Sequence, residues 1–316
     1  MLTDYKITHA KIPFSRLLMW SWVVCCLFQW PVRADIPAAF VDIGFGARPM
    51  GMCGAFTAVA ADANAIFWNP AGLALLRKNH FTIMHTKQLD LIPYNLGAYA
   101  FRAGGHTAGV AFLTSGNDVL RETSLFVSYA ARLELPILGR AYLGGNLRYR
   151  NATFGQNEDG GQNRSQGSAD GFGVDLGLIY QIGKRTRAGI FCRDMINNMT
   201  YHNTTRNTVY AERVPTTLTG GIASQLKENI LFAADFGKGL YSDAYNKIHI
   251  GGDVRLLRVL HLRSGLWQNM AKELNRNYSL GFGIEFVKSR LGVQFDFAYL
   301  INDLANSPRI SLSLLH

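Results

Sequence analysis

Seven histidines follow residue 34, and they are the first candidates for chemistry because imidazole can act as a general base near neutral pH. A serine hydrolase needs a histidine beside a serine, with an acidic group to orient the ring. The sequence contains no Gly-x-Ser-x-Gly motif, so no nucleophile is marked. We therefore predict that the protein is not an enzyme and has no catalytic residues. The histidines are His80, His85, His106, His202, His249, His261 and His316.

A second group of candidates consists of charged residues that alternate with apolar ones. We expect them to line the interior of the molecule, where mixed charges can pair without any catalytic role. No group of Cys and His has the spacing of metal ligands, and the acids are scattered along the chain, so we expect neither a metal nor a cofactor. We also place Cys53 inside and Cys192 outside, without a disulfide between them. The predicted interior set is Asp175, Asp235, Asp253, Arg263, Glu285 and Asp296.

The composition limits the class of protein. Charged residues make up 17% of the 316, below the roughly 25% of a soluble domain. The mean hydropathy of +0.03 fits a membrane barrel, in which only every second strand residue faces lipid. The net charge is +10, but no basic helix or zinc spacing accompanies it, so a nucleic-acid partner is not expected.

Residues 1–34 have the organisation of a secretory signal peptide. Lys6, Lys11 and Arg16 precede an apolar run that extends from Leu17 to Trp30, and the small residue Ala34 would precede the cut. This run is shorter than the ~20 residues that cross a bilayer. We therefore expect cleavage after Ala34; the alternative is an uncleaved anchor helix.

From about residue 79 onward, apolar residues recur at every second position. This period of two is typical of strands, which present alternate residues to opposite faces. One face is almost entirely aliphatic and aromatic, whereas the other carries many glycines and the acids named above. A soluble sandwich would carry Lys, Glu and Thr on its polar face, so the pattern favours a barrel in a membrane. The last segment shows the pattern well: Leu291, Val293, Phe295, Phe297 and Tyr299 alternate with small or polar residues.

The connections between these strands alternate in length. Short ones lie near residues 104, 183, 227, 257 and 288, and longer ones lie between them; the connection at 133–140 is the exception. Outer-membrane barrels have short turns at one end and long loops at the other. We predict an all-β fold, a transmembrane antiparallel up-and-down β-barrel of about 14 strands with a small N-terminal helical plug. The expected location is the bacterial outer membrane.

Residues 35–78 do not alternate. Two Ala-rich stretches, 50–61 and 65–77, predict helices, the second capped by Asp62 or Asn64. The segment is too apolar for a disordered arm and too short for a separate domain, so we expect a plug inside the barrel. The predicted organisation is therefore a signal peptide (1–34), a plug (35–78) and a barrel (79–316).

Residues 42–60 and 62–72, including Asn69-Pro70-Ala71, closely resemble the start of PorV/PorQ-like outer-membrane proteins. That group is similar to the FadL-like long-chain fatty acid transporters (OMPP1/TodX). The resemblance implies a fourteen-stranded barrel with a plug that shifts and releases a ligand sideways through the wall. Asn69-Pro70 also fits an ordinary helix cap. The residues of the plug motif are Gly46, Ala47, Arg48, Gly51, Met52, Gly54, Asp62, Asn64, Trp68, Asn69, Pro70 and Gly72.

Two functions follow from the resemblance. The first is a channel for hydrophobic small molecules of the fatty-acid type, with the lipid bilayer and such a ligand as partners. The second is a protein-binding barrel of a type IX secretion-like system, with secreted cargo or secretion machinery as partners. The second would use loops 151–169 and 194–213, whose plausible anchors are Tyr201, Arg206, Tyr210 and Arg213. The composition of these loops fits mobile solvated segments better than a binding surface.

Overall fold

The computed structural model describes residues 44–88, 91–135, 139–155, 166–240, 246–257, 259–270, 276–288, 291–302 and 306–316. The predicted signal peptide, residues 1–34, lies outside these ranges. None of the helices in the described ranges is long and apolar enough to cross a membrane.

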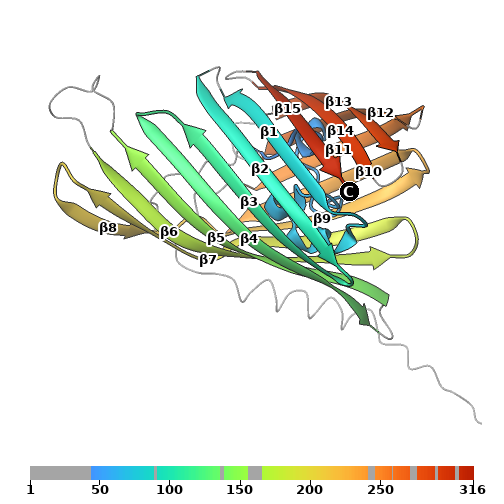
Figure 1. Ribbon diagram of the computed structural model, residues 1–316, viewed down its shortest axis with the longest axis horizontal. Coiled ribbons are helices and arrows are strands. Elements are labelled where there is room, and N and C mark those ends of the chain that lie inside the picture. The colour runs from blue at the N-terminus through green and yellow to red at the C-terminus, as the bar shows by residue number, and fades with distance from the viewer. Residues whose placement is uncertain are drawn as a thin grey trace, which may run out of the picture. The chain divides into compact units, whose positions relative to one another are not determined.

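Fifteen strands form one antiparallel sheet that closes on itself (Figure 1). The first strand pairs with the last, from His80 opposite Leu315 to Thr86 opposite Arg309. Strand β8 pairs only with β7, so the closed wall has 14 strands, as predicted. The strands are β1 (His80–Gln88), β2 (Ile92–Ala103), β3 (His106–Gly116), β4 (Leu120–Leu135), β5 (Gly139–Phe154), β6 (Gly167–Ile182), β7 (Thr186–Asn203), β8 (Thr208–Glu212), β9 (Thr217–Lys227), β10 (Ile230–Gly239), β11 (Lys247–Leu256), β12 (Leu260–Asn269), β13 (Arg276–Lys288), β14 (Leu291–Ile301) and β15 (Ser307–Leu315).

The period of two separates the two faces of the wall. On β4, Phe126 and Ser128 are buried inside, whereas Val127 and Tyr129 are exposed outside. Exposed large apolar side chains of this kind occur on strands around the whole barrel. A water-facing surface of this composition would be unfavourable, but a bilayer solvates it well. The outward face is therefore suited to lipid.

The two ends of the barrel differ in the length of their connections. At one end only residues 104–105 separate β2 from β3, and only 228–229 separate β9 from β10. At the other end 155–166 separate β5 from β6, and 240–246 separate β10 from β11. The predicted sorting holds for the connections after β5. It is wrong at 89–91 and 117–119, where only three residues separate β1 from β2 and β3 from β4. The expected exception disappears, because β4 continues to Leu135 and β5 begins at Gly139. We call the second end the long-loop end.

The wall is irregular at β7. Three residues of β7, from Arg193 to Met195, lie opposite Asp175 of β6, which makes a bulge. Beyond Arg193, β7 leaves β9 and pairs later with the short strand β8, from Met199 to Asn203. The loop expected at 194–213 is wrong, because β7 continues to Asn203 and forms a hairpin with β8 despite the Asn- and Thr-rich composition.

Residues 44–76 lie inside the barrel and are almost wholly buried (Figure 1). We call residues 44–76 the plug segment. It contains two short helices, α2 (Ala47–Gly51) and α3 (Ala65–Trp68), and a 3-10 helix, η1 (Pro70–Leu75). The helix expected over 50–61 is wrong beyond Gly51. The left-handed φ of 51° at Cys53 and 77° at Gly54 turns the chain there, and residues 52–54 and 57–59 form turns.

Candidate functional site

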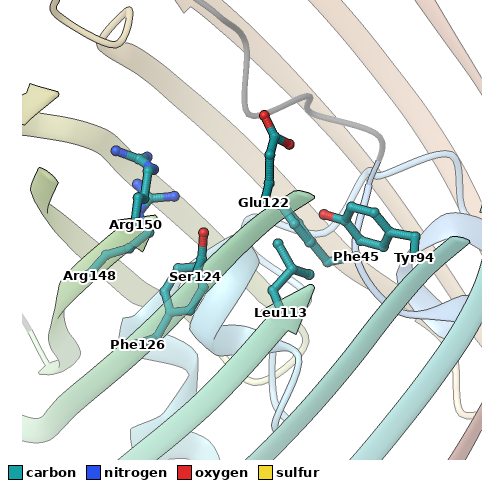
Figure 2. Close-up of a pocket in the computed structure, with 8 residues that line it drawn as sticks. All are labelled: Phe45, Tyr94, Leu113, Glu122, Ser124, Phe126, Arg148 and Arg150. Carbon is teal, nitrogen blue, oxygen red and sulfur yellow. The ribbon is translucent and has the colours of Figure 1, made fainter. Parts of the chain in front are cut away.

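A pocket opens between the plug segment and the inner wall of strands β2 to β5 (Figure 2). It lies toward the long-loop end, because Tyr94 is near the start of β2 and Leu113 near the end of β3. Its enclosed space is about 20 Å³, about the room that one water molecule needs, so a larger ligand enters only when lining side chains move. The lining residues are Phe45, Tyr94, Leu113, Glu122, Ser124, Phe126, Arg148 and Arg150.

The apolar side of the pocket is built on Phe45 of the plug segment. Its ring stacks on Phe67 with centroids 5.0 Å apart and meets Trp68 edge-on at 6.3 Å. The indole Nε1 of Trp68 donates to the carbonyl of Phe45 at 2.8 Å, which fixes the backbone there. Phe126 of β4 packs edge-on against Phe67 at 5.1 Å. Aromatic contacts thus connect the pocket to the plug segment's interior.

The charged side of the pocket is formed by two arginines of β5. Arg148 lies 2.8 Å from both Asp175 of β6 and Asp194 of β7. Arg150 donates to both carboxylate oxygens of Asp194, at 2.6 and 2.8 Å. All four side chains are buried. Such buried charges are tolerated because they are paired and hydrogen-bonded.

Asp194 connects this charged side to the break in the wall. It has a φ of 55° and stands where β7 leaves β9. Its carbonyl accepts a hydrogen bond from Thr216 Oγ1 at 2.7 Å and from Asn197 Nδ2 at 2.8 Å. Asn197 also exchanges two hydrogen bonds with the backbone of Val214. Side chains therefore join the wall here, in place of a backbone ladder.

Arg193 connects the same break in the wall with the plug segment. It donates to the carbonyl of Phe67 at 3.0 Å, and its guanidinium lies 5.6 Å from the centre of the Phe45 ring. Phe45 consequently touches both the pocket and the neighbourhood of the break. A molecule that displaced Phe45 would disturb the contacts of both.

Asn69, a predicted motif residue, is fully buried and holds the plug segment against the wall. Its Nδ2 donates to the carbonyls of Thr57, Leu178 and Ile190 at 2.9, 3.2 and 3.4 Å. Its Oδ1 accepts from the amide of Ala71, and Pro70 begins η1, so the pair is also a helix cap. A Cβ on Gly177 would lie 2.0 Å from Asn69 Oδ1, and one on Gly144 would lie 2.4 Å from Pro70. Glycine in the wall makes this approach possible.

The remaining motif residues hold the fold of the plug segment and its contact with the wall. Arg48 pairs with Asp62 at 2.8 Å, and Asp62 accepts from the amide of Asn64. The Ala47 amide donates to Ser311. Cys53 is buried and free, and burial raises the pKa of its thiol to about 11. The close glycine contacts are Gly46 with Asn64, Gly51 with Arg263, Gly54 with Trp68, Gly72 with Ala60, and Met52 with Gly251 and Gly265.

The predicted interior set divides into three groups. Asp175 belongs to the charged side of the pocket, and Asp235 binds the plug segment through the amides of Phe56 and Thr57. The other four residues form a separate network in which Arg263 lies 2.8 Å from Asp253 and 2.6 Å from Asp296. His261 lies between Asp253 and Glu285 in that network. It is thus held in an ion-pair network without a nucleophile beside it among the described residues.

Sequence reasoning missed five residues that shape the pocket or its connection to the wall. Arg148 and Arg150 alternate with Leu147 and Tyr149, so the same period of two would have placed them inside. Asp194 lay in the expected loop, and Phe45 lies in the segment 42–60 but was not among the motif residues named. Glu122 lies near the start of β4, where the alternation alone gave no sign of a pocket.

No family model matches the sequence, and no curated protein is significantly similar to it. Solved structures are similar in fold. The CymD monoaromatic hydrocarbon channel is 16% identical with a TM-score of 0.65, over 88% of this chain and 98% of that chain. A Pseudomonas aeruginosa FadL homologue is 10% identical with a TM-score of 0.57, over 86% and 98%. The fold is that of FadL-like channels.

The Pseudomonas putida toluene transporter TodX has the same fold, at 12% identity and a TM-score of 0.55 over 86% of this chain and 97% of that chain. These likenesses extend over most of both chains in each pair, so the shared fold includes the complete barrel. They support the FadL-like part of the sequence resemblance and do not bear on its PorV/PorQ-like part.

Proposed function

We propose that the protein lies in a bacterial outer membrane and admits small hydrophobic molecules through the barrel. The observation that carries this proposal is the pocket between the plug segment and the wall, with Phe45, Leu113 and Phe126 on its apolar side. An apolar molecule gains free energy in such a site because it leaves water. The fold shared with hydrocarbon channels supports the same function.

The break at β7 is the exit that we propose. The pocket's arginines bind Asp194 at this break, and Arg193 joins it to Phe45. An apolar ligand that leaves through the wall enters lipid directly and avoids the water beyond the barrel. Side-chain hydrogen bonds close this part of the wall, and they open at a lower cost than a continuous ladder of strand hydrogen bonds.

Uptake by cells tests the function. Cells that make the protein should take up a radiolabelled monoaromatic hydrocarbon faster than cells that lack it. Leu113→Trp should abolish this difference, because the larger ring fills the pocket. Leu125→Trp is the matched control, since Leu125 is exposed on the outer face of β4. The amount of each variant in the membrane is measured by immunoblotting.

Two results would contradict the proposal. One is uptake that does not depend on the protein at all. The other is normal uptake by cells that make the Leu113→Trp variant, which would mean that the ligand does not pass through this pocket.

The second candidate function is a protein-binding barrel of the PorV type in a type IX secretion-like system. It is favoured by β8, whose outer edge pairs with no strand in the described ranges, and which exposes Val209 and Tyr210. An open strand edge can bind an extended segment of another protein. If the uptake test fails, co-purification of a secreted protein that is lost with Tyr210→Ala would favour this function.

A further inference from the structure

Four charges on the wall beside the pocket are balanced among themselves. Arg148 and Arg150 carry two positive charges, and Asp175 and Asp194 carry two negative charges at distances of 2.6–2.8 Å. Recruiting the arginines to bind an anionic ligand would require breaking these ion pairs. Leaving buried aspartates without partners is strongly unfavourable. The two arginines therefore stay bound to Asp175 and Asp194 of the wall.

Glu122 is not part of these ion pairs. It lies on β4 with Ala152 opposite it on β5, while Ser124 is opposite Arg150 and Phe126 is opposite Arg148. It forms no ion pair and accepts no hydrogen bond from any residue in the described ranges. The guanidinium of Arg150 is bound to Asp194 by two hydrogen bonds.

The position of Glu122 relative to the apolar side is visible in Figure 2. The two arginines lie on one side of the pocket, Phe45 and Tyr94 lie on the other, and Glu122 stands between them. A ligand whose apolar body contacts Phe45 and Leu113 would bring a polar end group toward this carboxylate.

We propose that the pocket selects apolar molecules that carry a hydrogen-bond donor or a positive charge, such as aryl or alkyl amines and alcohols, and that it discriminates against carboxylates through Glu122. This proposal rests on the proposed function and specifies its substrate class. A carboxylate ligand would meet the charge of Glu122, while the nearby Arg148 and Arg150 are bound to aspartates. An amine or hydroxyl would supply a donor that Glu122 does not receive from the part of the chain that the structure describes.

Four ligands with the same ring test this selection: benzylamine, benzyl alcohol, toluene and benzoate. Trp267→Phe leaves Trp68 as the single tryptophan after residue 34, and Trp68 touches Phe45. Its fluorescence at pH 8, in purified protein from which residues 1–34 have been removed, gives a Kd for each ligand. We expect benzylamine to bind at least ten times more tightly than benzoate, with benzyl alcohol between them.

Glu122→Gln removes the charge but keeps the size, so the ratio of the benzoate Kd to the benzylamine Kd should fall toward one. Toluene binding should not change. Glu134→Gln is the control, because Glu134 is an exposed residue of β4 outside the pocket. Benzoate binding as tight as benzylamine, or discrimination that survives Glu122→Gln, would overturn the selection. If none of the four ligands binds, toluene included, the proposed function is overturned instead.

Discussion

Asp235 shows how a single inward residue holds the plug segment. Its side chain is 3% exposed on β10, and its Oδ2 accepts hydrogen bonds from the amides of Phe56 and Thr57, both at 2.8 Å. These amides occur in a turn region, where no helix supplies an acceptor. The wall therefore satisfies donors that the plug segment cannot satisfy itself.

Asp235→Ala should lower the stability of the folded protein by about 1–3 kcal/mol, because it leaves two buried amides without an acceptor. Asp235→Asn keeps an acceptor oxygen and should cost less. Heat-induced unfolding of the purified protein, followed by its change in mobility on gels, measures both. Equal losses for the two variants would mean that the charge of Asp235, rather than hydrogen bonding, holds the plug segment.

At the residue scale the sequence predicted the face on which Asp235 lies but not its partners. Phe56 and Thr57 precede it by 179 and 178 residues, and no local pattern connects such distant positions. The same limit applies to Arg150 and Asp194, which are 44 residues apart. Alternation within a strand says which side chains point inward, whereas contacts between strands depend on register.

The break in β7 is the element on which the proposed exit depends. Asn197 donates to the carbonyls of Asp194 and Val214 and accepts from the amide of Val214, at 2.7–2.9 Å. No backbone pairing of β7 with β8 or β9 is present between Met195 and Asn198. One side chain thus makes most of the hydrogen bonds that close this position.

Asn197→Ala should open the wall more often and accelerate the uptake of a hydrophobic ligand. Each lost hydrogen bond is worth about 1 kcal/mol, so three of them could raise the open population about tenfold or more. Uptake per molecule of protein in the membrane measures this. Asn198→Ala is the control, because Asn198 is exposed and bonds the amide of Phe172 instead. Unchanged uptake in Asn197→Ala would place the exit elsewhere.

Elements were predictable where one physical pattern dominated them. The fourteen wall strands follow from alternation, because each must present an apolar face to lipid. The prediction of a helix over 50–61 was wrong beyond Gly51. An Ala-rich composition favours a helix only when tertiary contacts do not prefer turns. Met52 packs against the wall glycines Gly251 and Gly265, and the turned backbone at Cys53 and Gly54 brings it there. β8 was missed because five residues are too few to show a period.

At the scale of the whole molecule, the barrel separates two environments. The outward face is apolar around the described wall, and the inner face is filled by the plug segment and by ion-paired networks. The sorting of turn and loop lengths made this arrangement predictable from the sequence. The pocket was not predictable, because it is formed where four strands and Phe45 meet in space.

The last prediction concerns the contact of the outward face with lipid. Val127 lies midway along β4 and is 62% exposed, whereas Val209 on β8 is 66% exposed but lies in a hairpin outside the closed wall. Val127→Arg should destabilise the folded protein by about 2–4 kcal/mol if the middle of the strand lies at the middle of the bilayer.

Val209→Arg, a substitution of the same kind at similar exposure, should cost little because water can solvate the new charge. Folding of both variants into lipid vesicles, followed by urea titration, measures the difference. If both are tolerated equally, lipid does not surround β4 and the outward apolar face must contact protein instead. If both are destabilised, the β7–β8 hairpin lies in the membrane, and the open edge of β8 is then unavailable to a partner in water.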